Sequence, residues 1–325
     1  MPDRALAYGV VADTAVADND QVALTGWTHA TTQPEMTTST LELPDVDLVH
    51  DVRGPIPTVD GRPPLFMIGQ PMCADGFAAL AREFPDRTVL TYDPRGLGRS
   101  TTRRDGRTDQ DPKDQAADLH ALVEHLGAGP VDVFASSGGA VTGLEWALAH
   151  PADLATVVAH EPPSLWALPD ADAAGRATDR VTTTYAEKGF GHGMAEFIRM
   201  SGWQGEYTDD YFAQPPADPA QFGLPTEDDG SRDDPLLSAR SDAVTASRPD
   251  VDALRGTPVR IVIGVGEETG NAVTARTARG VAEATGLPLV VFPSHHGGFA
   301  AADGPWPGKS VEFGARLREV LAGDL

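Results

Sequence analysis

Apolar and polar residues follow two alternating rhythms along the chain, which predicts strands and helices in turn. Short continuous apolar runs, such as "LFMIGQ" from Leu65, are typical of strands buried on both faces. Stretches with apolar residues three and four apart, such as "DQAADLHALVEHL" from Asp114, predict amphipathic helices. Because the connections between them are short, we predict an α/β fold with a mostly parallel central sheet and helices on both faces.

The strand rhythm is interrupted once. It begins near Thr40 with an opening hairpin, stops after "LATVVAHEPP" and resumes at "TPVRIVIGVG". The segment between carries predicted helices at 173–188 and 194–200, and an insertion over the carboxyl ends of such a sheet is expected to form a helical lid. We therefore predict a core of residues 39–162 and 256–325, a lid of residues 163–255, and a poorly ordered N-terminal extension of residues 1–38, for which Met36 is an alternative start.

The charge balance limits the partners. Lys and Arg number 25 against 48 Asp and Glu, a formal charge of −23, which repels phosphate backbones and anionic membranes. Nucleic acid and membrane partners are therefore not predicted, and no apolar run approaches the roughly 18 residues of a membrane span. A single cysteine, Cys73, leaves no internal disulfide, and we predict a cytoplasmic protein.

Two adjacent serines in "VFASSGGAV" lie between a predicted strand and a predicted helix. A nucleophilic serine at such a turn needs small residues two positions before and two after it, because the backbones cross closely there. Ser137 has Ala135 and Gly139 at these positions, whereas Ser136 has Phe134 at the first of them. We predict Ser137 as a nucleophile; the alternative interpretation is an ordinary helix N-cap.

Acyl transfer at a serine also needs a base. Two histidines, His295 and His296, follow the last predicted strand in "VVFPSHHGGF", where a loop can reach the serine. By contrast, His50 and His120 lie inside predicted elements, which favours ordinary surface or core roles. The adjacent pair lacks the spacing and further ligands of a zinc site, and no metal is predicted.

The order of these motifs resembles that of the α/β-hydrolase fold family. The resemblance covers about residues 41–325 and rests on "LFMIGQPMCADGF", "YDPRGLGRS", "ASSGGA", "VAHEPP" and "FPSHHGGF". It implies that His296, not His295, is the base. It also implies an oxyanion hole formed by the backbone N–H groups of Gln70 and Gly138.

Two positions compete for the acid that orients the base. The common family position selects Glu267, beside Glu268, in "GVGEETGNAV". The other family position follows the strand after the nucleophile helix and selects Glu161. The "ASSGG" and "HEPP" segments are similar to those of zearalenone lactonases, in which this glutamate is the acid. We favour Glu161 and keep Glu267 as the alternative.

No cofactor is predicted, because "DPRGLGRS" lacks the ending of a phosphate loop and "GVGEETG" lacks the glycine spacing of a dinucleotide fingerprint. Aromatic residues of the lid are expected to form mainly its own core, with one or two lining an apolar pocket. The candidate substrate contacts are Met72, Trp166, Trp203 and Tyr207.

These features predict a cofactor-independent serine hydrolase that cleaves an ester or lactone of a small apolar molecule through an acyl-enzyme. The same triad would also support thioester or C–C bond hydrolysis or peroxide-forming chemistry. An alternative of another class is a protein that binds a small molecule on this fold without turning it over. The substrate and the oligomeric state are not predicted.

Overall fold

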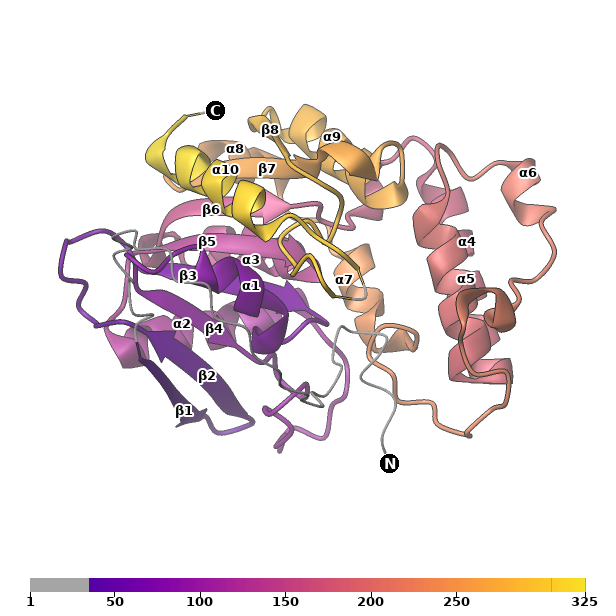
Figure 1. Ribbon diagram of the computed structural model, residues 1–325, viewed down its shortest axis with the longest axis horizontal. Coiled ribbons are helices and arrows are strands. Elements are labelled where there is room, and N and C mark those ends of the chain that lie inside the picture. The colour runs from indigo at the N-terminus through magenta and orange to yellow at the C-terminus, as the bar shows by residue number, and fades with distance from the viewer. Residues whose placement is uncertain (1–34, 305, 325) are drawn as a thin grey trace, which may run out of the picture.

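A single eight-stranded sheet forms the centre of the computed structural model, which describes residues 35–304 and 306–324 (Figure 1). The strands lie in the order β1-β2-β4-β3-β5-β6-β7-β8. Strand β2 pairs antiparallel with β1 and β4, and all other neighbours pair parallel. The strands are β1 (Met36–Glu42), β2 (Asp47–Arg53), β3 (Leu65–Gln70), β4 (Val89–Tyr92), β5 (Val131–Ser137), β6 (Leu154–His160), β7 (Arg260–Gly266) and β8 (Leu289–Phe292).

Helices cover both faces of the sheet, which confirms the predicted architecture. The alternation along β3 shows why: Phe66 and Ile68 pack into one apolar cluster, and Leu65 and Met67 into another on the opposite face. Helices α2, α3, α8 and α9 contribute to the first cluster, and α1 and α10 to the second. These helices are α1 (Ala78–Arg82), α2 (Pro112–Leu126), α3 (Gly138–Ala149), α8 (Val251–Gly256), α9 (Val273–Thr285) and α10 (Ser310–Ala322).

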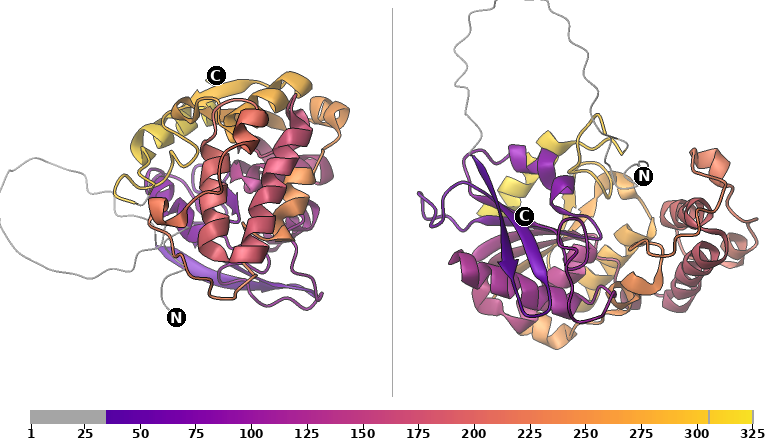
Figure 2. Two further views of the ribbon diagram at one scale, coloured as in Figure 1. Left: turned by 90° about the vertical axis from the view of Figure 1, so that its right-hand side faces the viewer. Right: turned by 90° about the horizontal axis from the view of Figure 1, so that it is seen from below.

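Residues 163–255, called the insertion below, lie between β6 and β7 and end within α8, which packs on the sheet and not with the rest of the insertion. Helices α4 and α5 pack side by side and stand apart from the sheet (Figure 2). Two small apolar clusters, centred on Tyr211 and Tyr185, form the core of this part. The helices here are α4 (Ala171–Lys188), α5 (Phe190–Gly202), α6 (Asp209–Phe212) and α7 (Asp242–Ala246).

Several boundaries differ from the predicted ones. Strand β1 begins at Met36, so residues 36–38, which we assigned to the extension, pair with β2. Residues of β1 are exposed on both faces of the strand, so its sequence has no alternation of apolar and polar residues that would predict where it begins. Residues 1–34 lie outside the described part of the chain, which leaves the rest of that prediction open.

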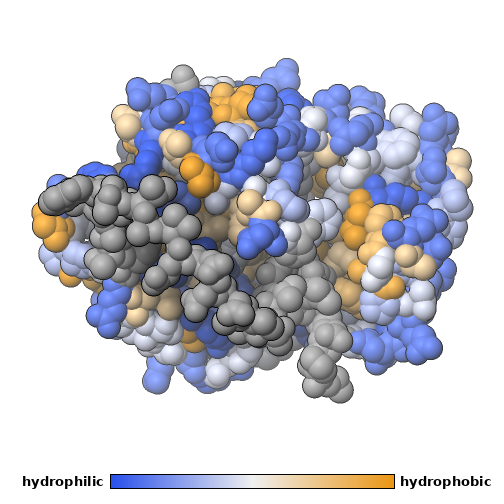
Figure 3. Space-filling view, viewed as in Figure 1, coloured by the Kyte–Doolittle hydropathy of each residue, from blue (hydrophilic) through white to orange (hydrophobic). Residues whose placement is uncertain are grey.

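The surface seen in Figure 3 is predominantly hydrophilic over the described residues. Among the described helices, none combines the length and the apolar character that crossing a bilayer requires.

Candidate functional site

The residues predicted to carry the chemistry lie at one edge of the sheet, where the parallel strands end. The register pairs Gln70 with Ser137, Ser136 with His160, and His160 with Gly264. The carboxyl ends of β3, β5, β6 and β7 therefore meet at this edge, which is where open α/β sheets bind ligands.

Ser137 ends β5 in a strained conformation with φ 56° and ψ −127°, a region that non-glycine residues rarely adopt. Helix α3 starts at the next residue, Gly138. The turn is tight, because a Cβ atom at Gly139 would lie 2.6 Å from the carbonyl oxygen of Ile68. Ser136 is buried. The backbone of this turn therefore places the side chain of Ser137, and not that of Ser136, at the end of the strand.

Replacing Gly139 by Ala is expected to destabilise the protein by about 1 to 3 kcal/mol, because the added methyl group meets the backbone of β3 rather than a mobile side chain. The matched control is Gly175→Ala in α4, where nothing lies within 4 Å of the new Cβ. That change is expected to stabilise by about 0.5 to 1 kcal/mol. Urea unfolding measures the change in the free energy of unfolding for both variants. Equal changes would show that the turn at Gly139 can accommodate a methyl group.

Glu161 follows β6 directly and is fully buried. Its positive φ of 48° turns the side chain across the end of β7. One carboxylate oxygen accepts the backbone N–H of Gly266 at 2.8 Å, and the other accepts the hydroxyl of Thr274 at 2.7 Å. The second oxygen also lies 2.7 Å from Nδ1 of His296. Burial alone would raise the pKa of Glu161, but the hydrogen bond and charge of His296 outweigh it and hold that pKa well below its usual range.

The two adjacent histidines have different surroundings. His295 Nε2 lies 3.1 Å from the carbonyl oxygen of Pro307, and its Nδ1 accepts the backbone N–H of Gly297. His296 instead uses Nδ1 toward Glu161, which leaves Nε2 as the nitrogen that can meet a hydroxyl proton. Glu267, the alternative acid, lies in the exposed turn after β7. The structure therefore brings Glu161 to His296, as favoured from the sequence.

Gln70 and Gly138, the predicted oxyanion donors, lie against each other. A Cβ at Gly138 would collide with the side-chain oxygen of Gln70 and lie 2.7 Å from its carbonyl oxygen. The Gln70 side chain donates to the hydroxyl of Ser241 at 3.0 Å, and Val244 approaches Gly138. Ser241 and Val244 belong to the insertion and were missed, because nothing in their local sequence signals contacts with residues more than 100 positions away.

His160 is a third residue whose role the sequence analysis did not predict. Its ring is fully buried among phenylalanines and lies 6.1 Å from the ring of His296, at an interplanar angle of 27°. Neither ring nitrogen has a hydrogen-bond partner among the described residues. Burial lowers the pKa of His160 to about 4. The "HEPP" segment contained this histidine, but a buried neutral imidazole has no sequence signature.

The neutral His160 makes stability depend on pH. Its folded pKa of about 4 lies below the unfolded value of 6.5, so the unfolded chain binds a proton first and stability falls as pH drops from 6.5 to 4. Between pH 7 and pH 5 this contribution is about 2 kcal/mol. Urea unfolding at pH 7 and pH 5 measures this contribution. On going to pH 5, the free energy of unfolding should fall by about 2 kcal/mol less in His160→Leu than in the parent or in the exposed control His125→Leu. Equal losses in all three proteins would contradict the low pKa of His160.

Met72 and Trp166 remain candidates for substrate contacts. Met72 packs on Gly69 and Gly76 and, with Pro71 and Cys73, lines a cavity of about 580 Å³. Neither Ser137 nor His296 lines this cavity, which instead borders residues 71–75, the segment that follows Gln70.

Trp166 is half-buried, and its indole N–H is enclosed without a hydrogen-bond partner among the described residues. The guanidinium of Arg248 lies 5.6 Å from its ring centroid.

Trp203 and Tyr207 are engaged within the insertion, which gives a substrate role no support. The indole N–H of Trp203 donates to the carbonyl of Glu206 at 3.0 Å. The Tyr207 hydroxyl donates to the carbonyl of Met200 at 2.9 Å, and both rings pack edge-on against Tyr211. The structure therefore places them in the core of the insertion, the role expected for most of its aromatic residues.

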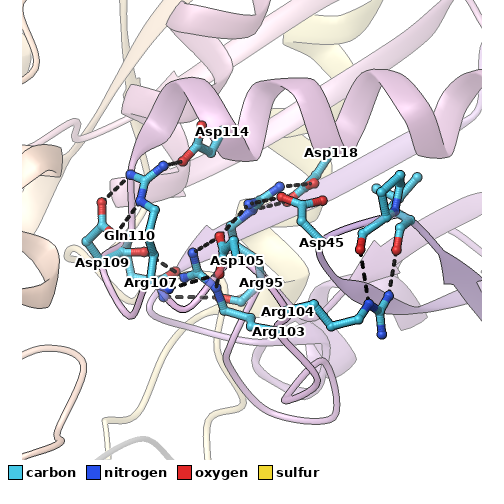
Figure 4. A network of polar contacts seen from close by, with 12 residues as sticks. Asp45, Arg95, Arg103, Arg104, Asp105, Arg107, Asp109, Gln110, Asp114 and Asp118 are labelled. Atoms are coloured by element: carbon cyan, nitrogen blue, oxygen red, sulfur yellow. Dashed lines mark hydrogen bonds and ion pairs between the residues drawn. The ribbon is translucent and has the colours of Figure 1, made fainter.

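The turn "DPRGLGRS" after β4 is braced by ion pairs (Figure 4). The Arg95 guanidinium makes two hydrogen bonds to the buried Asp118 of α2, at 2.7 and 2.6 Å, and a third to Asp45 at 3.0 Å. Burial raises the pKa of Asp118 to about 6 despite Arg95. Asp93 accepts the backbone N–H groups of Ala74 and Arg99. These contacts give the turn a structural role, because they tie it to α2 and to the segment after β3.

Comparisons with known proteins agree with this fold. Residues 65–216 match the model of the alpha/beta hydrolase fold family. An uncharacterized hydrolase of Bacillus subtilis, YraK, is 33% identical over 126 residues, which are 38% of this chain and 44% of that protein. The match thus spans less than half the length of this relative.

Solved structures extend the likeness to nearly the whole chain. A proline iminopeptidase of Mycobacterium smegmatis has 21% identity and a TM-score of 0.59, covering 89% of this chain and 98% of that one. A thermophilic esterase of Thermogutta terrifontis has 21% identity and a TM-score of 0.57, with the same coverage. With the family match and the order of the strands, these likenesses show that the chain has the α/β-hydrolase fold.

Proposed function

We propose that the protein is a serine hydrolase that cleaves an ester or lactone of a small apolar molecule through an acyl-enzyme. Ser137 is the nucleophile, His296 the general base and acid, and Glu161 the residue that orients His296. The contact of 2.7 Å between His296 Nδ1 and the buried Glu161 carboxylate carries the proposal. Its support is chemical: a buried anion beside Nδ1 fixes the imidazole tautomer and stabilises the imidazolium.

The reaction follows from these roles. His296 Nε2 takes the hydroxyl proton while Ser137 Oγ attacks the carbonyl carbon, and the backbone N–H groups of Gln70 and Gly138 stabilise the oxyanion. The imidazolium then returns the proton to the leaving oxygen as the C–O bond breaks. Water then takes the place of the leaving group: His296 Nε2 accepts a proton from water as the water oxygen attacks the acyl carbon. His296 returns this proton to Ser137 Oγ as the acid is released. None of these steps needs a cofactor or metal.

The insertion acts in this proposal as the lid that selects the substrate. Ser241 and Val244 contact the two oxyanion residues, so the insertion reaches the reacting centre directly. Thioester, C–C bond and peroxide-forming chemistry share the triad and differ in the bond that is cleaved or in the nucleophile that replaces water.

Labelling by a fluorophosphonate probe tests the proposal independently of the substrate. We expect one modified residue, Ser137, identified by peptide mass spectrometry, and unimpaired labelling of Ser136→Ala. A panel of short p-nitrophenyl esters, aromatic lactones, thioesters and diketones then separates the reaction classes. If the folded protein neither reacts with the probe nor hydrolyses any panel member, it is a binding protein on this fold and the proposal is wrong.

A further inference from the structure

Three half-buried residues with metal-ligating side chains meet at the opposite edge of the sheet from Ser137. His120 lies in α2, His150 directly follows α3, and Asp153 ends the short 3-10 turn that leads into β6. One ligand atom of each lies within 4.8 Å of the others. These residues lie near the amino end of β6, whereas the proposed catalytic groups follow the carboxyl ends of the strands. The cluster is therefore separate from the site already described.

The two imidazoles are stacked, with ring centroids 3.8 Å apart and planes at 10°. Asp153 Oδ2 lies 2.8 Å from Nδ1 of His120 and accepts the indole N–H of Trp146 at 2.9 Å. The buried Trp146 ring thus fixes the carboxylate, and the carboxylate orients His120. Such an outer hydrogen bond to a ligand is typical of metal centres in proteins.

We propose that His120, His150 and Asp153 bind a divalent transition-metal ion, with Zn²⁺ as the fitting example. Two imidazole nitrogens and one carboxylate oxygen are a ligand set that Zn²⁺ accepts, with water in the fourth position. Tetrahedral Zn²⁺ at usual bond lengths separates its ligand atoms by about 3.3 Å. The His120 and Asp153 atoms, now 2.8 Å apart, need to move by only about half an ångström. A nitrogen of His150 lies within 4.8 Å of the other two ligand atoms, so rotation of its ring must bring it closer by up to about 1.5 Å.

The surroundings favour a cation. Glu124, one turn further along α2, places a carboxylate oxygen 3.5 Å from Nε2 of His120. The chain as a whole carries a formal charge of −23, which raises the local concentration of cations. Because the ligands come from α2 and from the segment between α3 and β6, a bound ion would tie these parts together. Its effect is therefore expected on stability and not on turnover.

Titration of the metal-stripped full chain with Zn²⁺ in a calorimeter tests the proposal. We expect one ion per chain, and binding at least tenfold weaker in His120→Ala, in His150→Ala and in Asp153→Asn, which keeps an acceptor for Trp146. The matched control is His125→Ala, an exposed histidine of the same helix, which should bind as the parent does.

Two further readouts separate a site from a loss of folding. Saturating Zn²⁺ should raise the melting temperature of the parent and of His125→Ala by about 2 °C or more, and leave that of the His120 and His150 variants unchanged. Bound Co²⁺ should show the visible bands of a low-coordinate site in the parent alone. Absence of one-to-one binding overturns the proposal, and so does binding that both histidine variants retain. Binding lost in His296→Ala instead would assign the ion to the catalytic edge and equally overturn it.

Discussion

Replacing Ser137 by Ala is expected to reduce turnover of any substrate found in the panel by about four to six orders of magnitude. The reason is that the remaining groups can still bind the substrate and its oxyanion but have no nucleophile to form the acyl-enzyme. The fold should be unchanged, since Ala fits the same backbone and loses only one hydroxyl group. Initial rates beside a thermal unfolding curve measure both quantities.

Two companion variants make this result specific. Ser136→Ala removes a buried hydroxyl next to the elbow and is expected to retain turnover within about tenfold of the parent, since that side chain has no proposed chemistry. Ser137→Gly should be as inactive as Ser137→Ala but more stable by about 1 kcal/mol, because glycine adopts a φ of 56° without strain. Comparable residual turnover in Ser136→Ala and Ser137→Ala would mean that the hydroxyl of Ser137 is not the nucleophile.

Replacing Glu161 by Gln is expected to lower turnover by about three to four orders of magnitude. Both carboxylate oxygens accept hydrogen bonds, from Gly266, Thr274 and His296, so an amide places an NH₂ group opposite a donor at one of these positions. His296 then loses its negative partner, and its tautomer is no longer fixed. Single-turnover rates with a p-nitrophenyl ester report the loss, and circular dichroism reports folding.

Glu267→Gln is the matched control, because it makes the same chemical change at the competing acid. Glu267 is exposed in the turn after β7, and we expect turnover within about twofold of the parent. The opposite pattern, with loss of two or more decades in Glu267→Gln alone, would transfer the orienting role to Glu267.

The layout of the core could be predicted from the sequence because its signals are local. Buried runs such as 65–70, helices ended by Gly127 or Pro151, and the order of motifs each depend on a few neighbouring residues. The choice of Ser137 over Ser136 depended only on the size of residues two positions away. Local sequence patterns therefore predict the helices, strands and turns, because these depend on contacts between residues close together in the chain.

What escaped prediction depends on long-range packing. Thr274 bonds to Glu161 across 113 residues, and Ser241 bonds to Gln70 across 171. A threonine inside a helix or a serine in a loop is common, so its sequence context gives no sign of such a partner. The His120 and His150 stack was missed for the same reason, because each histidine alone suits an ordinary surface position.

The insertion leaves the core after β6 and rejoins it before β7, two adjacent strands of the sheet. The strand ends that carry Ser137 and Glu161 therefore lie outside the insertion, on the sheet that supports it. The insertion is anchored to the core at several places: the piece holding Ser241 and Val244 abuts Gln70 and Gly138, Arg276 of α9 pairs with Asp170, and Ser247 donates to Glu145 of α3. Evolution, or a grafting experiment, can thus alter specificity through the exposed faces of α4 and α5, provided that these anchoring contacts are retained.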